Sequence, residues 1–106
     1  MNLAQHPDQA LRNKLNLETS RMAWRELQTH FASGIVIAVD GELDLIDVAV
    51  QIANDNKTLV AQWISAALLG PATDASAAAW LDQDARMWTV VVKPWILVQH
   101  EKPAIR

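Results

Sequence analysis

Residues 35–39 constrain the fold of this chain more than any other stretch of its sequence. The segment reads Ile-Val-Ile-Ala-Val, so every position is apolar and four of the five are β-branched. Branched side chains favour extended backbone, and side chains alternate between the two faces of a strand. A strand that is apolar at every position is typical of a sheet covered on both faces. The sequence therefore predicts a strand here with packing partners on either side.

Two apolar stripes of helical period follow this strand. Apolar residues at positions 45, 48, 49, 52 and 53 share one helix face, and Asp44 stands where an N-cap is expected. A second stripe at positions 59, 60, 63, 64, 67 and 68 predicts another helix, which Gly70-Pro71 is expected to end. The polar residues 54–56 join the two helices and supply a cap for the second.

A third, short helix is predicted after these two. Thr73 or Asp74 is expected to cap it. Its inward-facing side chains are predicted to be Ala77, Trp80 and Leu81, which follow helical spacing.

The two ends of the chain predict longer elements. A helical region is expected over residues 8–32, with a second helix starting near Thr19 as the alternative, and Gly34 is a natural stop. Residues 87–99 favour extended chain. Pro94 cannot donate to a ladder, and a two-residue hairpin at Lys93-Pro94 is disfavoured because hairpin turns need positive φ. One bent strand is therefore predicted.

Together these elements predict an α+β fold with about four helices on a small two- to three-stranded sheet. A chain of 106 residues fits one domain, expected over residues 11–100. Residues 1–10 and 101–106 are expected to be flexible tails. Two helices joined by a polar turn and followed by extended chain also match helix-turn-helix or winged-helix order.

Composition narrows the compartment and the chemistry. The chain has no Cys, which excludes disulfides and thiolate chemistry and favours a reducing compartment. Its N-terminus lacks the apolar core of a signal peptide, and no apolar run is long enough to span a bilayer, so a cytoplasmic protein is expected. Three Gly are too few and too dispersed for a phosphate-binding loop, and no cofactor is expected.

Fragments in a fixed order resemble a known family. They are Trp24-x-x-Leu27-x-x-His30, Leu43-Asp44-Leu45, Ile52-Ala53-Asn54-Asp55-Asn56 followed by Trp63-Ile64, Trp80, and Pro94 with Leu97-Val98-Gln99. Over about residues 11–100 the chain resembles the small bacterial family catalogued as domain of unknown function 2288. The resemblance implies a single bacterial domain, and it brings no activity, substrate, cofactor or catalytic residue.

An acidic run is the best sequence candidate for polar chemistry. It comprises Asp40, Glu42, Asp44 and Asp47, and His30 is the one histidine well inside the predicted domain. Carboxylates on a turn suit a hard cation, but a calcium-binding loop needs Gly at its sixth position and a carboxylate at its twelfth. Counted from Asp40, those positions hold leucine and glutamine. We therefore expect Asp44 to cap the next helix and Asp47 to complement its positive end, with no metal bound.

The five Trp supply the remaining candidate surface. Trp88 and Trp95 are seven residues apart, so a regular strand would place them on opposite faces and leave one exposed unless Pro94 bends the chain. An exposed Trp beside an unpaired strand edge suits a protein partner or a second copy of the chain. The sequence therefore predicts a non-enzymatic protein-interaction module, with a homodimer as one form of the interaction.

Two alternatives remain beside this prediction. The first is a nucleic-acid-binding, winged-helix-like regulator, which the helix order permits. The net charge of −3, with one Lys against three Asp in residues 43–70, argues against phosphate contacts. The second is a small enzyme or metal-binding protein that uses the acidic run of residues 40–47.

Overall fold

The structure is a computed structural model that describes residues 8–100. These residues form five α-helices, one short 3₁₀ helix (η1) and five strands. In chain order they are α1 (Gln9–Glu18), β1 (Ser20–Ala23), η1 (Trp24–Leu27), α2 (Gln28–Ala32), β2 (Val36–Val39), α3 (Leu45–Ala53), α4 (Lys57–Ser65), β3 (Leu69–Pro71), α5 (Asp74–Asp82), β4 (Arg86–Val92) and β5 (Trp95–His100).

The five strands form one mixed sheet in the order β1-β4-β5-β2-β3. Only β2 and β5 run parallel, with Val36 opposite Ile96 and Ala38 opposite Val98. The other three pairs are antiparallel. The predicted strand at residues 35–39 is thus the inner strand β2, and its apolar pattern on both faces reflects helices above and below it.

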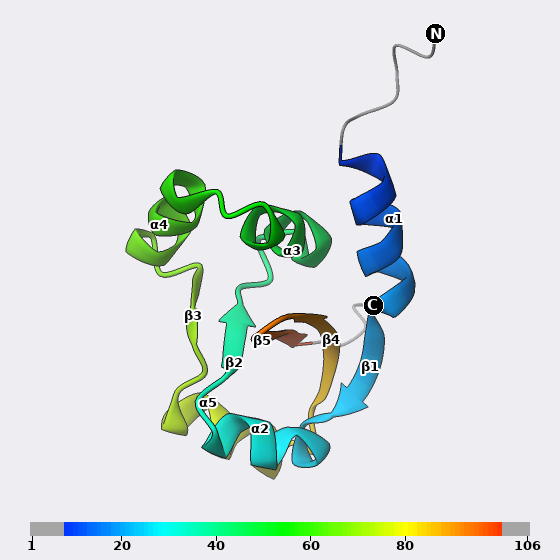
Figure 1. Ribbon diagram of the computed structural model, residues 1–106. Coiled ribbons are helices and arrows are strands. Elements are labelled where there is room, and N and C mark those ends of the chain that lie inside the picture. The colour runs from blue at the N-terminus through cyan, green and yellow to red at the C-terminus, as the bar shows by residue number, and fades with distance from the viewer. Residues whose placement is uncertain (1–7, 101–106) are drawn as a thin grey trace, which may run out of the picture.

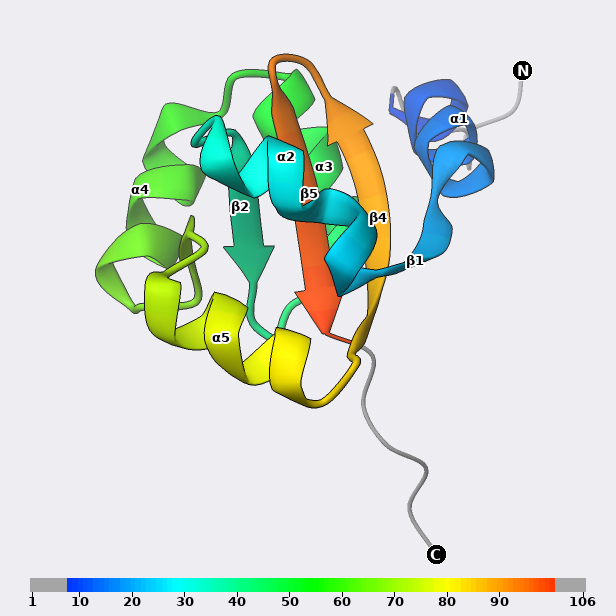
Figure 2. The ribbon, with the colours of Figure 1, turned by 90° about the horizontal axis from the view of Figure 1, so that it is seen from below.

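Helices cover both faces of the sheet, as Figure 1 shows with the sheet between two helical layers. α3 and α4 lie on one side with α1 beside them, and α2 and α5 lie on the other. Figure 2 looks onto the second side, where α2 and α5 cross in front of β2 and β5. Each face therefore has its own hydrophobic core.

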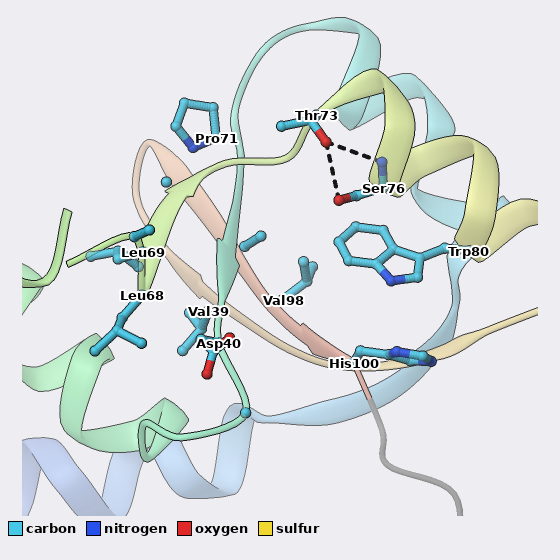
Figure 3. Close-up of a pocket in the computed structure, with 14 residues that line it drawn as sticks. Val39, Asp40, Leu68, Leu69, Pro71, Thr73, Ser76, Trp80, Val98 and His100 are labelled. Atoms are coloured by element: carbon cyan, nitrogen blue, oxygen red, sulfur yellow. Dashed lines mark hydrogen bonds between the residues drawn. The ribbon is translucent and has the colours of Figure 1, made fainter. Parts of the chain in front are cut away.

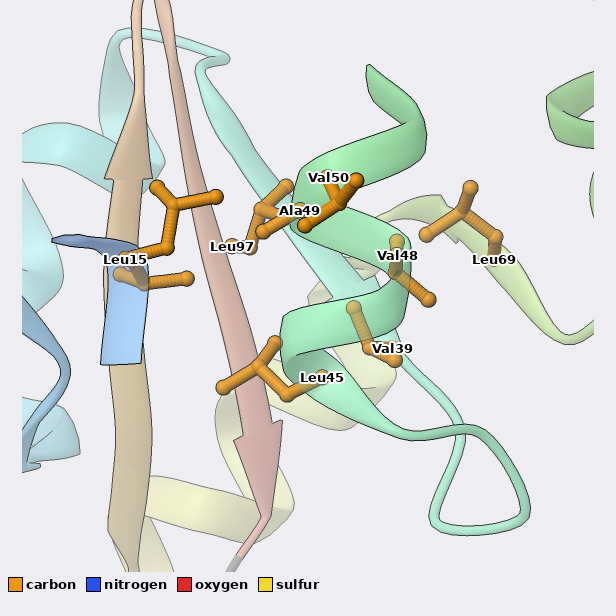
Figure 4. Packing of buried hydrophobic residues seen from close by; sticks show 9 residues of the cluster. Leu15, Val39, Leu45, Val48, Ala49, Val50, Leu69 and Leu97 are labelled. Carbon is orange, nitrogen blue, oxygen red and sulfur yellow. The ribbon is translucent and has the colours of Figure 1, made fainter. Parts of the chain in front are cut away.

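The first core lies under α1 and α3. Its fully buried members include Val48, Ala49 and Val50 of α3, which pack with Val90 and Leu97 of the sheet (Figure 4). The first three positions of the predicted stripe are buried, whereas Ile52 is half-buried, Ala53 is exposed, and Val50 joins the core instead. Asp44 caps this helix by accepting hydrogen bonds from the backbone N–H groups of Ile46 and Asp47.

The second core lies under η1, α2 and α5. Trp24 is fully buried there, with its ring 4.8 Å from Trp80 and 5.6 Å from Phe31, both in edge-to-face geometry. Such pairs add about 0.5–1.5 kcal/mol beyond the area they bury. Met87 and Val98 supply the sheet side of this core.

Three predicted boundaries are confirmed by the hydrogen bonds that form them. Asn56 accepts from the N–H of Leu59 at the start of α4, and Thr73 accepts from the N–H of Ser76 at the start of α5. Gly34 follows α2 with a φ of +77°, a conformation that glycine adopts without steric cost. These bonds are local, which is why sequence patterns predict them.

The predicted two- to three-stranded sheet with about four helices is wrong. The predicted helical region over residues 8–32 is broken by β1, whose Met22 and Ala23 pair with β4. Gly70-Pro71, predicted as a helix stop, lies in β3. Both missed strands are edge strands of three or four residues, too short for a clear alternation of apolar and polar positions.

The predicted bent strand over residues 87–99 is two strands. β4 and β5 form an antiparallel hairpin closed by Lys93-Pro94, with Val92 paired to Trp95. The Lys93–Pro94 peptide bond is cis. Neither Lys93 nor Pro94 has a positive φ, so the turn closes without the conformation on which the objection to a two-residue hairpin depends.

The helix-turn-helix or winged-helix alternative is also wrong. α3 and α4 are consecutive helices, but α3 packs on β4 and β5 as a cover for the sheet. α4 contacts α3 and the edge strand β3 and has no fully buried residue. The pair is thus part of a layered α/β/α arrangement. Among the described residues, no helix is long and apolar enough to cross a membrane.

Candidate functional site

A pocket of about 590 Å³ opens on the face of the sheet that α5 covers. We call it the α5 pocket (Figure 3). It lies at the carboxyl ends of β2 and β5, the one parallel pair among the described strands. Asp40 follows the end of β2, and His100 ends β5. Crevices outside the carboxyl ends of parallel strands are frequent ligand sites in α/β proteins.

Small residues on the sheet create the hollow. Its floor includes Ala38, Gly70 and Val98 from three adjacent strands. Ala38 is paired with Gly70, so a side chain at position 70 points to the same face as Ala38. A Cβ added to Gly70 would meet no atom within 4 Å. The pocket is therefore open space that a larger residue at position 70 could fill.

An aromatic wall and two hydroxyl groups bound the pocket. The rings of Trp80 and His100 lie 6.2 Å apart at a tilt of 56°. On the side of the α5 N-terminus, the hydroxyl of Thr73 donates a 3.0 Å hydrogen bond to Ser76 Oγ and accepts one from the Ser76 N–H (Figure 3). Thr73 is thus occupied by capping, while the hydroxyl hydrogen of Ser76 remains available.

The charged groups of the α5 pocket follow from its lining. Among residues 8–100, Asp40 is its one carboxylate, and no Lys or Arg lines it. Asp40 Oδ2 accepts a 2.9 Å hydrogen bond from the backbone N–H of Glu42. The second carboxylate oxygen, Oδ1, has no hydrogen-bond partner within residues 8–100.

The pocket brings together a hydroxyl, an imidazole and a carboxylate, but they do not act as a unit. Within the described part of the chain, no hydrogen bond joins Ser76, His100 and Asp40. Nucleophilic catalysis needs a base within hydrogen-bond reach of the nucleophile, and a third group that orients the base. The arrangement offers a binding surface rather than an activated nucleophile.

The residues of the predicted polar site are dispersed. His30 is exposed on α2 and precedes β2, whereas Asp40 follows β2 at its other end. Asp44 caps α3, and Asp47 Oδ1 accepts a 2.6 Å hydrogen bond from Arg12 of α1. Glu42 is exposed in the loop between β2 and α3. In the described range, no group of three or more His, Asp or Glu is placed to hold a metal ion.

The contact between Arg12 and Asp47 changes the pKa of Arg12. The hydrogen bond that Arg12 donates to Asp47 raises the pKa of the Arg12 guanidinium. Desolvation opposes this rise, and attraction to Asp47, Asp44 and Asp8 adds to it. The pair joins α1 to α3 across the protein surface. It is a structural contact between two helices.

A second hollow lies at the sheet edge, between α4, β3 and the start of β5. We call this hollow of about 370 Å³ the Trp95 groove. Its apolar lining comprises Ile37, Ile52, Val60, Ile64, Leu69 and Trp95. Ile64 is 54% exposed and Trp95 is 37% exposed, so two large apolar side chains border it in solvent. Asp55 and Lys57 lie at one end, 3.8 Å apart.

The structure places the predicted interaction residues as follows. Trp95 lines the groove, and Pro94 is exposed in the adjoining turn. Trp88 is 38% exposed at the far end of β4, with the guanidinium carbon of Arg21 5.6 Å from its ring centre. The hairpin puts Trp88 and Trp95 on the same face of the sheet, separated by the paired Val90 and Leu97. The two Trp therefore do not form one patch.

Sequence reasoning missed the α5 pocket. The sequence predicts an inward-facing Trp80, which is half-buried, and gives no signal that His100 lies beside it. Only the parallel pairing of β2 and β5 brings residues 40 and 100 to one edge. The sequence does carry one signal for this edge, because apolar runs such as those of β2 and β5 are typical of inner parallel strands. Parallel neighbours have their carboxyl ends at the same edge of the sheet.

Comparison with known proteins gives a family match. The family model described as protein of unknown function (DUF2288) matches residues 10–100. The solution structure of the protein PA1075 from Pseudomonas aeruginosa is similar to this chain, with 35% sequence identity, a TM-score of 0.78 and full coverage of both chains. No curated protein matches the chain.

Proposed function

Since the chain belongs to the DUF2288 family, whose description states no function, we propose from its own surfaces that it is a non-catalytic module that binds a partner protein. The proposed binding site is the Trp95 groove. The occupant that we propose is an amphipathic helix of the partner.

The observation that carries this proposal is the exposed apolar lining of the groove. Ile64 and Trp95 keep large apolar surfaces in water at the rim, where a fold built for stability alone would bury them. Exposed apolar patches of this kind mark interaction sites, and Trp is enriched at the centres of protein interfaces. The groove is lined mainly by aliphatic side chains, which suits side chains inserted from a partner.

The neighbouring strand edge argues against a partner that adds a β-strand. The backbone N–H of Asp40 donates to the carbonyl of Leu68, and the N–H of Ala72 donates to the carbonyl of Val36. Because the residues of an antiparallel strand alternate in bonding to their neighbour, the backbone polar groups of Leu69 and Pro71 point away from β2, toward the free edge. Pro71 has no N–H at that outward position, and β3 has only three residues. A helix that inserts side chains at i, i+3 or i+4, and i+7 needs no backbone bonds from the groove.

The charge of the protein restricts the partner further. The net charge of −3 favours a neutral or basic partner segment, because like charges across an interface are unfavourable. At the groove itself, Asp55 and Lys57 offset one another, so specificity is expected to come from shape and apolar contact.

The dispersal of titratable side chains supports a non-catalytic role. The candidate polar residues His30, Asp44 and Asp47 lie apart, and two of them have structural tasks in capping and helix pairing. A metal-independent activity of the purified protein that is lost in His30→Ala or Asp47→Ala would overturn this part of the proposal.

Site-specific photo-crosslinking in the cells that produce the protein tests the groove. A photoreactive residue replaces Ile64, and in a second variant it replaces Leu81, which is 51% exposed on α5 at the opposite face. We expect a defined protein to be captured from position 64 and not from position 81. Capture of the same protein from both positions, or of none from position 64, contradicts the proposal.

A binding measurement with the captured partner completes the test. Its helical segment is titrated into ¹⁵N-labelled protein, and shifts are expected at Ile52, Val60 and Leu69. Ile64→Asp should weaken binding at least tenfold, about 1.4 kcal/mol, whereas Leu81→Asp should leave it unchanged. If sedimentation of the protein alone instead shows a dimer that Ile64→Asp dissociates, the occupant is a second copy, and the proposal of a distinct partner is overturned.

A further inference from the structure

We propose that the α5 pocket is a second, separate binding site that takes a small organic amine: an ammonium group that carries an aromatic or aliphatic body. The proposal does not depend on the Trp95 groove, which lies on the opposite face of the sheet. It is based on the charge, the aromatic wall and the apolar floor of the pocket.

The sign of the ligand's charge follows from the lining. Of the residues 8–100 that line the pocket, Asp40 is the one carboxylate, and none is Lys or Arg. Phosphate and carboxylate ligands are bound by Arg, Lys or clustered backbone N–H groups. An anion in the α5 pocket would instead meet an unpaired carboxylate in a protein of net charge −3. The electrostatics therefore favours a cation.

The size and surface of the pocket favour an organic cation over a metal ion. A volume of about 590 Å³ lies within the range of small-molecule sites. Among residues 8–100, Asp40 and His100 are the two lining residues of the kinds that commonly hold metals, and no group of three or more such residues is placed to hold a metal ion. Trp80 offers the aromatic face that attracts cations most strongly, and Val98 and Ala38 offer apolar contact to the body of the ligand.

Hydrogen bonding fits an ammonium group as well. An ammonium has three donors and no acceptor, so its site must supply acceptors. Asp40 Oδ1 is without a hydrogen-bond partner in residues 8–100, and Ser76 Oγ retains a lone pair besides its bond from Thr73. Both atoms belong to residues that line the pocket.

Three probes of matched shape test the charge and the place of binding. ¹⁵N-labelled protein is titrated with 2-phenylethylamine, 2-phenylethanol and phenylacetate at millimolar concentrations. We expect the amine to shift the amides of Ala38, Gly41 and Gly70 and the indole N–H of Trp80. The alcohol should bind about threefold to tenfold more weakly, as expected for loss of one ion pair, and the acid should not bind.

Two substitutions and a matched control locate the site. Asp40→Asn keeps an oxygen that can accept from Glu42, so the loop is retained, and it should reduce amine affinity to that of the alcohol. Gly70→Val should fill part of the pocket and abolish binding of both probes, and its Cβ would meet no atom within 4 Å. Asp82→Asn removes a charge from exposed Asp82 outside the pocket and should leave amine affinity unchanged. Thermal melts of each variant verify folding.

The outcomes separate this inference from the proposed function. The inference is overturned if the amine causes no shifts, if the alcohol binds as tightly as the amine, or if Asp40→Asn and Asp82→Asn behave alike. A failure of partner binding at Ile64 leaves the comparison of Asp40→Asn with Asp82→Asn unaffected, because neither Asp40 nor Asp82 lines the Trp95 groove, whereas Gly70 lines both hollows.

Discussion

The acidic residues from Asp40 to Asp47 have different structural roles, although all of them carry a carboxylate. Asp40 accepts a bond from its own loop and faces a pocket, Asp44 caps a helix, and Asp47 pairs with Arg12 of α1. Each role is set by the backbone or side-chain donor nearest to it. A cluster in the sequence has become three separate interactions in the structure.

Substitution of Asp44 separates capping from charge. Asp44→Ala is expected to lower the free energy of unfolding by about 1 kcal/mol, because two backbone N–H groups lose their acceptor. Asp44→Asn should lower it by only a few tenths of a kcal/mol, since asparagine is an equally good cap. Urea unfolding followed by circular dichroism measures both.

The control for this prediction is Asp47→Ala. The Arg12–Asp47 pair is exposed to solvent, so its contribution should be below about 1 kcal/mol and should shrink at high ionic strength. The loss in Asp44→Ala should persist in salt. If both variants respond to salt alike, Asp44 acts through its charge and not as a cap.

At the scale of the element, the short edge strand β3 combines two functions. It extends the sheet beside β2 through Gly70, and it separates the α5 pocket from the Trp95 groove. Its outward backbone carries Pro71, which removes one donor from an exposed edge. Proteins commonly protect edge strands in this way against pairing with other chains.

Pro71→Thr is expected to weaken that protection. The variant restores an outward N–H and introduces a residue that favours strands, so association through the sheet edge should increase with concentration. Its free energy of unfolding should change by less than about 1 kcal/mol. Sedimentation velocity over a concentration series measures the effect. A variant that sediments like the parent protein at every concentration contradicts the edge-protection role.

At the scale of the whole molecule, the two hydrophobic cores share one sheet. Leu97 of β5 belongs to the core under α1 and α3, and its neighbours Ile96 and Val98 belong to the core under η1, α2 and α5. Loss of packing on either face therefore acts on the same central strand. We expect the two cores to unfold together.

Leu97→Ala tests this coupling. It should lower the free energy of unfolding by about 2–5 kcal/mol, the range for buried leucine. The NMR signal of the Trp24 indole N–H, which lies in the other core, and far-UV circular dichroism should give coincident transitions. Leu17→Ala is the matched control, because Leu17 is 86% exposed and its loss should have little effect. Transitions that separate would show that the cores unfold independently.

The sequence determined the elements whose signals are local. The strand at residues 35–39, the helix after Asp44, the cap at Asn56 and the stop at Gly34 all follow from side chains within a few positions of the feature. The same applies to the family, because the order of short fragments is a property of the chain itself. Local bonds and periodicity suffice for these predictions.

Only the tertiary structure decided which strands pair and what their pairing brings together. β1 and β3 became strands because inner strands offered them partners, and the parallel pairing of β2 with β5 placed Asp40 and His100 at one pocket. The amphipathic stripe of α4 predicted burial, yet Ile64 stayed exposed because the sheet ends at β3 beneath it. Both candidate sites depend on contacts between distant segments, and such contacts leave no periodic pattern in the sequence.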